Sequence, residues 1–307
     1  MISNFFSKSK PIHYIVVSII LLVVFVLSKL NTFSEGIDIY LISKQTGLFL
    51  VCLFSVFVFD FLVTRNSLTK KNSYNIVLYV LFFAMLPQAI LNSEIIFANL
   101  FVLLALRRLI SLRTQKDIKK KLFDASFWIA VATLFYFWSW VFFALIFIAL
   151  LTYGITDIKN YIIPLIGIAT VGVITICYLI IFNVDILDFA HSLFDYSLDY
   201  TTLNSKQVIV ASTLLLSFGL WALFYYIKNI KSQMKSYRPS FKLIIITAVL
   251  ALLIVVFAPS KNGSEFIFLF APLSIIMTNY LEVISENWFK ETLLWTIILT
   301  PIALLML

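Results

Sequence analysis

Long apolar runs separated by short polar islands form the main pattern of this 307-residue chain. Most of the runs hold the roughly 20 residues that a helix needs to cross about 30 Å of hydrocarbon. They cover residues 12–30, 45–63, 73–90, 95–112, 123–151, 161–182, 207–227, 243–258, 265–283 and 291–307. The pattern predicts a single membrane domain over residues 1–307, folded as an all-α bundle of transmembrane helices.

One of these runs, residues 123–151, is too long for a single crossing, since its 29 residues would make a helix of about 43 Å. Basic residues give a second argument, because Lys and Arg in short loops collect on the cytoplasmic side of a membrane. With the N-terminus inside, one crossing places 14 basic residues inside and 9 outside, whereas two crossings place 19 inside and 4 outside. We therefore expect a short or broken helical pair with its turn near residues 135–140, about 11 spans in all, and a cytoplasmic N-terminus.

Composition excludes several classes of protein. The chain is 62% hydrophobic and 12% charged, about half of the ~25% charged share of a soluble domain. The net charge of +8 comes from Lys and Arg at the ends of apolar runs, so no basic domain is left to bind nucleic acid. Only 7 glycines are present, which argues against a transporter built from broken, hinged helices. No nucleotide-binding, hydrolase or metal motif is found, and no cofactor or metal site is predicted.

Carboxylates gather in two segments expected on the outer side. The first outer loop, residues 31–44, carries Glu35 and Asp38, which can deprotonate an acceptor hydroxyl or bind a divalent cation. The second segment, residues 184–200, is predicted to be an amphipathic helix lying along the membrane. Its polar face would hold Asp185, Asp188, Ser192, Asp195 and Asp199. These residues form either an anionic groove or an ordinary solvated face.

Basic residues gather in the island at 107–121, which is expected on the cytoplasmic side. Arg107, Arg108 and Arg113 are the candidates for binding an anionic lipid headgroup or a polyprenyl phosphate. Their alternative role is only to set topology. Asp60 lies inside an apolar run, where a buried charge is costly. We expect it to pair with Arg65, or with the arginines of the island, and not to relay protons.

Three segments resemble an uncharacterised family of multispanning inner-membrane proteins from Bacteroidota, defined as a domain of unknown function. They are the opening NFFSKSKPI at residues 4–12, LLALRRLISLR at residues 103–113, and KKKLFDASFWI at residues 119–129 followed by LFYFW at residues 134–138. The resemblance implies a bacterial inner-membrane location and assigns no activity.

The layout of residues 95–151 is also similar, more distantly, to the GT-C glycosyltransferase superfamily, in which a span ending in basic residues precedes two short membrane segments. That similarity implies an enzyme acting on lipid-linked saccharide at the periplasmic face, with the outer carboxylates as catalytic groups. The alternative is a non-enzymatic scaffold or assembly subunit of an envelope complex, and a secondary transporter comes third. The expected partners are the lipid bilayer, a polyprenyl-phosphate lipid and a membrane protein.

Overall fold

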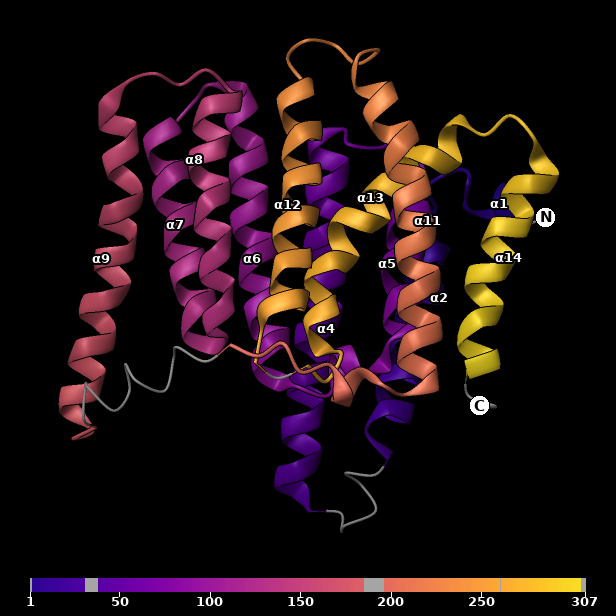
Figure 1. Cartoon of the computed structure of the whole chain (residues 1–307), viewed down its shortest axis with the longest axis horizontal. Helices are drawn as coiled ribbons and strands as arrows, with labels where there is room; N and C mark the ends of the chain where they lie inside the picture. The colour runs from indigo at the N-terminus through magenta and orange to yellow at the C-terminus, as the bar shows by residue number, and fades with distance from the viewer. Residues whose placement is uncertain (1, 31–37, 185–195, 260, 305–307) are drawn as a thin grey trace.

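The computed structural model describes residues 2–30, 38–184, 196–259 and 261–304, and this part of the chain contains helices and turns but no strand. Glu35, Asp185, Asp188 and Asp195 lie outside the described residues. The all-α bundle predicted from the apolar runs is confirmed. Figure 1 shows the helices lying side by side, with their connections at the upper and lower ends of the bundle.

Eleven helices of ten or more residues make up the described part of the chain. They are α2 (Pro11–Ser28), α4 (Ile39–Asn66), α5 (Tyr74–Met85), α6 (Ser93–Ser111), α7 (Ile118–Phe135), α8 (Phe143–Thr152), α9 (Ile158–Ile181), α11 (Lys206–Ile230), α12 (Arg238–Phe257), α13 (Ile267–Val283) and α14 (Asn287–Leu304). Seven helical stretches are long and apolar enough to cross a membrane, and α5 and the α8 region are shorter apolar helices. The chain is therefore a membrane protein, and the count of about 11 crossings stays a prediction.

Helix α13 forms the centre of the bundle, and α9 lies at its edge. In the apolar stretch of α13, 89% of the residues are buried, compared with 22% in α9. Helix α13 packs against α5, α6, α11 and α12, whereas α9 packs on α7 and α8 and stands at the left of Figure 1. A helix that is apolar on all sides belongs inside a bundle or facing lipid, and the two helices illustrate these two cases.

The long run at residues 123–151 is a helical hairpin, as predicted. Helix α7 ends at Phe135, Tyr136 has an extended backbone, and a 3-10 turn (Phe137–Phe142) leads into α8. The two helices lie side by side and antiparallel in Figure 1. No Gly or Pro makes this break. The rings of Tyr136 and Phe142 instead pack on Phe268 of α13, at centroid distances of 5.9 and 5.7 Å, so tertiary packing fixes the turn.

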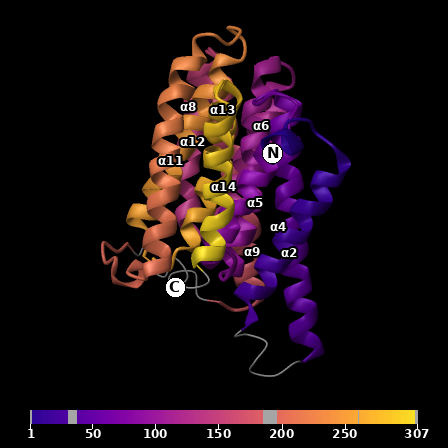
Figure 2. The same ribbon diagram turned by 90° about the vertical axis from the view of Figure 1, so that its right-hand side faces the viewer.

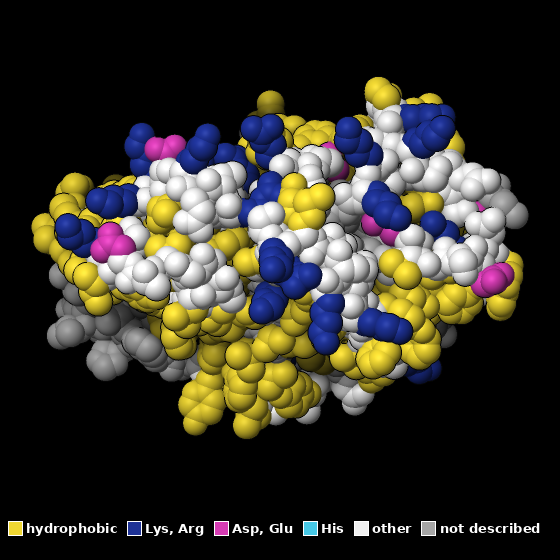
Figure 3. All heavy atoms as spheres, turned by 90° about the horizontal axis from the view of Figure 1, so that it is seen from above, with side chains coloured by type: hydrophobic (Ala, Val, Ile, Leu, Met, Phe, Trp, Pro, Cys, Tyr) yellow, Lys and Arg dark blue, Asp and Glu magenta, His cyan; other side chains and the backbone are white. Residues whose placement is uncertain are grey.

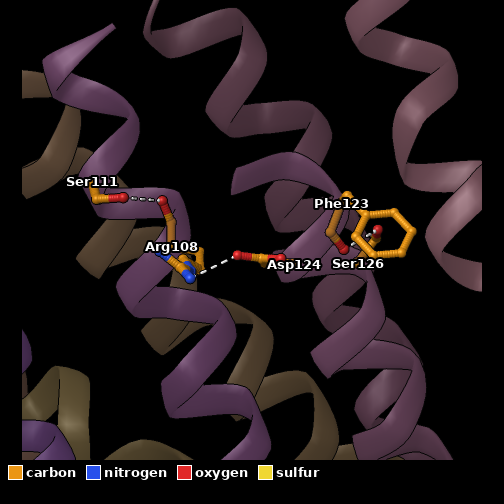
Figure 4. Close-up of polar contacts among 5 residues, drawn as sticks. All are labelled: Arg108, Ser111, Phe123, Asp124 and Ser126. Atoms are coloured by element: carbon orange, nitrogen blue, oxygen red, sulfur yellow. Dashed lines mark hydrogen bonds and ion pairs between the residues drawn. The ribbon is translucent and has the colours of Figure 1, made fainter. Parts of the chain in front are cut away.

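A glycine allows α9 to approach α7 closely. A Cβ atom on Gly167 would lie 2.0 Å from the Ser126 hydroxyl oxygen and 3.2 Å from the Phe123 carbonyl oxygen, so a larger residue requires the Ser126 side chain or one of the helices to move. The Ser126 hydroxyl donates to the carbonyl of Phe123 (2.9 Å), as Figure 4 shows. The close approach of α9 to α7 at Ser126 therefore depends on the missing side chain of Gly167.

Basic residues are concentrated at one end of the bundle. Lys29, Lys44, Lys206 and Lys261 lie at the helix ends that form the lower end, and the other 19 of the 23 basic residues lie at the upper end. Figure 2 shows the N-terminus toward that upper end. Figure 3, the view onto it, shows Lys and Arg side chains spread across the face.

Two segments differ from their predicted form. Helix α4 begins at Ile39, inside the expected first outer loop, and its 28 residues make it the longest described helix. The residues Tyr196–Tyr200, which the predicted amphipathic helix included, have no regular secondary structure. They instead lie along the end of α12, where the Tyr200 hydroxyl donates to the Val256 carbonyl and the Ser197 N–H to the Phe257 carbonyl. Bonds to a neighbouring helix thus replace the intrahelical ones that periodicity predicted.

Candidate functional site

A basic pocket opens at the upper end of the bundle, where α4 and α6 end and α7 and α12 begin. Its volume is about 550 Å³, within the range of about 300–1,000 Å³ that is usual for ligand sites. The residues that line it are Phe61, Arg65, Asn66, Ser67, Arg107, Arg108, Ser111, Arg113, Thr114, Lys121 and Tyr237. The pocket therefore joins segments that are far apart in the sequence.

Five of the lining side chains are cationic, and none is acidic. The three arginines predicted to bind a lipid phosphate, Arg107, Arg108 and Arg113, all lie here. Lys121 of the same basic island lines the pocket from α7, and the structure adds Arg65 from α4. The C-terminal ends of α4 and α6 carry partial negative charge, which stabilises cations placed there. So many positive charges in one cavity nevertheless repel each other, and an anion would relieve that repulsion.

Two polar contacts fix the wall between α6 and α7. Arg108 forms a salt bridge to Asp124 across the two helices, with 2.8 Å between the guanidinium nitrogen and the carboxylate oxygen, and Figure 4 shows the two side chains pointing toward each other. The Lys121 ammonium donates to the Ser111 carbonyl and to the Thr114 hydroxyl, both at 2.7 Å. These two cations therefore hold the wall in place.

Aromatic rings hold two further arginines. The Arg113 guanidinium lies 3.7 Å from the ring centre of Tyr237, at the start of α12, and that of Arg107 lies 5.2 Å from the ring of Phe61. Both distances fall within the range of cation–π attraction. Stacking on a ring uses the face of the guanidinium and leaves its N–H donors at the edge free.

Three arginines keep these donors for a ligand. In the part of the chain that the structure describes, Arg65, Arg107 and Arg113 make no hydrogen bond or ion pair. A guanidinium presents five N–H donors in a planar fork that matches the oxygens of a phosphate. The pocket thus contains several positioned N–H donors without partners among the described residues. An anion with several acceptor oxygens could bind them.

Sequence reasoning missed two members of the pocket, Arg65 and Tyr237, whereas Lys121 belongs to the basic island expected to attract an anionic headgroup. Arg65 follows its apolar run as an isolated cation, and Tyr237 lies in a different polar island from the arginines. A signal was present, since each residue flanks an apolar run on the side expected to be cytoplasmic. Which of these islands meet is decided by helix packing, and one sequence does not contain that information.

Of the five carboxylates predicted to be catalytic, only Asp38 lies in the part of the chain that the structure describes. Asp38 is exposed and precedes α4 without a side-chain hydrogen bond to the helix N-terminus, and the other four predicted catalytic residues lie outside the described residues. Asp199 is exposed as well, and the Thr201 backbone N–H that bonds it at 3.0 Å lowers its pKa. Within the described ranges, no three His, Cys, Asp or Glu residues are grouped so that they could hold a metal ion.

Asp60 does not pair with an arginine, so that prediction is wrong. One of its carboxylate oxygens accepts from the Tyr14 hydroxyl at 2.7 Å, and the other accepts from the Asn75 side-chain amide at 3.0 Å. Neutral donors therefore bind it inside the bundle. Arg65 and the arginines of α6 belong to the basic pocket instead.

Comparison with protein families identifies the chain but assigns no activity. A family model described as "Family of unknown function (DUF6427)" matches residues 1–306, so the chain belongs to this family. No curated protein and no solved structure matches the chain.

Proposed function

We propose that this member of a family of unknown function is an integral inner-membrane protein that binds a phosphate-bearing lipid headgroup in its basic pocket. The observation that carries the proposal is the set of three arginines, Arg65, Arg107 and Arg113, which line one cavity and make no hydrogen bond or ion pair within the described residues. The basic end faces the cytoplasm in this proposal, because Lys and Arg collect on that side. The N-terminus then lies inside.

The position of the pocket favours a lipid over a soluble anion. The arginines lie at or near the ends of apolar helices, where a membrane-spanning helix meets the headgroup region, and basic pockets between such helices bind anionic lipids. Phe61 lines the cavity, and 49% of this residue is exposed. An apolar residue at the rim of a charged cavity suits a ligand with a charged head and an apolar tail.

Topology alone accounts for the charge but not for its arrangement. The positive-inside rule requires basic residues near the cytoplasmic ends of helices, and exposed residues such as Lys116, Lys119 and Lys120 meet that need. It does not require five cations to line one cavity beside which, among the described residues, a single paired carboxylate, Asp124, bonds only Arg108 of the five. Such convergence is costly without an anion, and a phosphate ligand explains it.

A GT-C-like enzyme acting on lipid-linked saccharide at the periplasmic face is the second candidate. The observation that favours it is the short hairpin α7–α8, which follows a basic helix end in the layout that the resemblance implies. Its catalytic groups would be the outer carboxylates, with a divalent cation as a further expectation. The non-enzymatic alternative is a scaffold subunit of an envelope complex. All three roles are compatible with a lipid phosphate at the basic end.

The test is a binding titration with phosphatidic acid in detergent micelles. Changing Arg65, Arg107 and Arg113 together to Gln should weaken binding at least tenfold, since a hydrogen bond to a charged group contributes about 1.5–3 kcal/mol. The matched control changes Lys116, Lys119 and Lys120 to Gln, which removes the same charge outside the pocket, and its affinity should stay within about threefold of wild type.

Two further arms complete this experiment. Inorganic phosphate at millimolar concentration should not displace the lipid, and if it competes at low concentration the ligand is a soluble phosphate compound. Equal losses in the pocket variant and in the control variant would overturn the proposal, because the effect would then come from bulk charge. Absence of any phosphatidic acid binding by the wild type would overturn it as well.

A further inference from the structure

A second cavity, the polar pocket, adjoins the basic pocket and has different chemistry. Its volume is about 300 Å³. It is lined by Ser67, Leu68, Thr69, Lys70, Asn229, Gln233, Phe241, Asn279, Glu282 and Val283. Three amide side chains, one carboxylate and one lysine thus take the place of the four arginines and the lysine of the neighbouring cavity. We infer that this pocket binds an uncharged polyhydroxyl group that is esterified to the phosphate held in the basic pocket, so the inference rests on the proposed function.

Shared walls place the two cavities one helical turn apart. Ser67, which follows α4, lines both of them. Tyr237 of the basic pocket and Phe241 of the polar pocket are four residues apart at the start of α12, and residues at this spacing share a helix face with about 5–6 Å between their Cβ atoms. The two cavities are therefore neighbours, and one ligand with a phosphate and an attached group can contact residues of both.

The walls of the polar pocket are held by bonds within the protein. The buried Asn279 amide donates to the Leu68 carbonyl at 2.9 Å. One oxygen of Glu282 accepts from the Lys70 backbone N–H at 2.8 Å and from the Asn72 side chain at 2.5 Å. These contacts fasten the chain after α4 to α13. They occupy one Glu282 oxygen, and the other remains as an acceptor.

One short segment contributes to the walls of both cavities. Gln233 lines the polar pocket and Tyr237 the basic one, and both belong to the connection between α11 and α12. Arg238 fixes this connection by donating to the carbonyls of Gln233 at 3.0 Å and Lys231 at 2.6 Å. The hydrogen bonds of Arg238 therefore hold the segment that supplies a residue to each pocket. This arrangement suits a ligand that occupies both pockets.

The chemistry of the lining selects a polyol among the groups that a phosphate carries. The lining carries one carboxylate, Glu282, and one cation, Lys70, so a second phosphate would gain no net attraction from the charge of this pocket. An ammonium group would find this carboxylate already attracted to Lys70 and Lys290. Hydroxyl groups both donate and accept, so they match amide side chains, a carboxylate oxygen and backbone groups together. The volume lies at the lower limit for ligand pockets, so the polyol is the size of a glycerol or a single sugar ring.

The test compares three lipids with identical acyl chains: phosphatidylinositol, phosphatidic acid and phosphatidylethanolamine. Wild-type protein should bind phosphatidylinositol most tightly. Glu282→Gln, which preserves shape, and Gln233→Ala, in a surface connection, should each reduce the preference for phosphatidylinositol over phosphatidic acid by about three- to tenfold. Both should leave phosphatidic acid affinity within about twofold. The control is Glu286→Gln, which removes a carboxylate from an exposed position beyond α13.

The outcomes separate this inference from the proposed function. If phosphatidic acid binds through the arginines but phosphatidylinositol is not preferred, or if its preference survives both substitutions, the polyol inference is overturned and the proposed function stands. A preference for phosphatidylethanolamine overturns it in the same way. If none of the three lipids binds, both proposals fail.

Discussion

At the scale of single residues, the decisive feature is how the arginines of the basic pocket are held. Arg108 has a carboxylate partner in Asp124, whereas Arg113 has the face of Tyr237. A carboxylate neutralises a guanidinium and occupies its donors, but an aromatic ring orients the group and leaves the donors free. The sequence shows these arginines but not their partners, because Tyr237 follows Arg113 by 124 positions.

Replacing Arg113 by Lys tests this difference at constant charge. A lysine keeps the positive charge but lacks the planar fork that stacks on Tyr237 and binds two phosphate oxygens. We expect phosphatidic acid affinity to fall about three- to tenfold, which corresponds to the loss of about one hydrogen bond. The control Tyr237→Phe keeps the ring and should bind as wild type does. Unchanged affinity in Arg113→Lys would show that only charge matters at this position.

At the scale of elements, the sequence predicted the α7–α8 hairpin but not what makes it. Length and charge together required two crossings, and the turn falls at Tyr136, inside the predicted range. Its cause, packing of Tyr136 and Phe142 on Phe268, joins residues more than 120 positions apart. The predicted amphipathic helix shows the opposite outcome, a prediction that tertiary contacts overturn. Periodicity extended this helix to Tyr200, but contacts with α12 hold residues 196–200 outside any helix.

The glycine contact between α7 and α9 gives a prediction for the element scale. In Gly167→Ala the new Cβ would meet the Ser126 hydroxyl at 2.0 Å, so we expect a loss of about 1–3 kcal/mol in the free energy of unfolding. Gly172→Ala in the same helix meets nothing within 4 Å and should be neutral or stabilising by up to about 1 kcal/mol. Thermal unfolding in detergent measures both.

Adding Ser126→Ala to Gly167→Ala removes the clashing oxygen and should recover part of the lost stability. Equal stabilities of the two single glycine variants would contradict the close approach of α9 to α7.

At the scale of the whole molecule, charge is divided between the two ends of the bundle. The upper end holds 19 basic residues and the lower end 4, and both cavities of the proposed site lie at the upper end. The single sequence could predict this asymmetry, because each cation lies beside an apolar run. It could not predict the cavities, since their walls come from separate segments that only the three-dimensional packing of the helices brings together.

The orientation of the molecule follows from this asymmetry and can be measured by cysteine labelling. The background carries Cys52→Ser and Cys177→Ser. In intact spheroplasts, a membrane-impermeant maleimide should not label Lys235→Cys, at the basic end, and should label Asp199→Cys, at the opposite end. Lysis should expose the first cysteine. Labelling of Lys235→Cys before lysis would reverse the proposed orientation.

The most direct measurement of the central claim is the lipid that stays with the protein through purification in mild detergent. Mass spectrometry of the wild type should find a phosphate-bearing lipid near one per chain, and the variant with Arg65, Arg107 and Arg113 changed to Gln should lose most of it. The Lys116, Lys119 and Lys120 control should retain it. The same lipid content in all three proteins, or no phosphate-bearing lipid in the wild type, would contradict a phosphate site in the basic pocket.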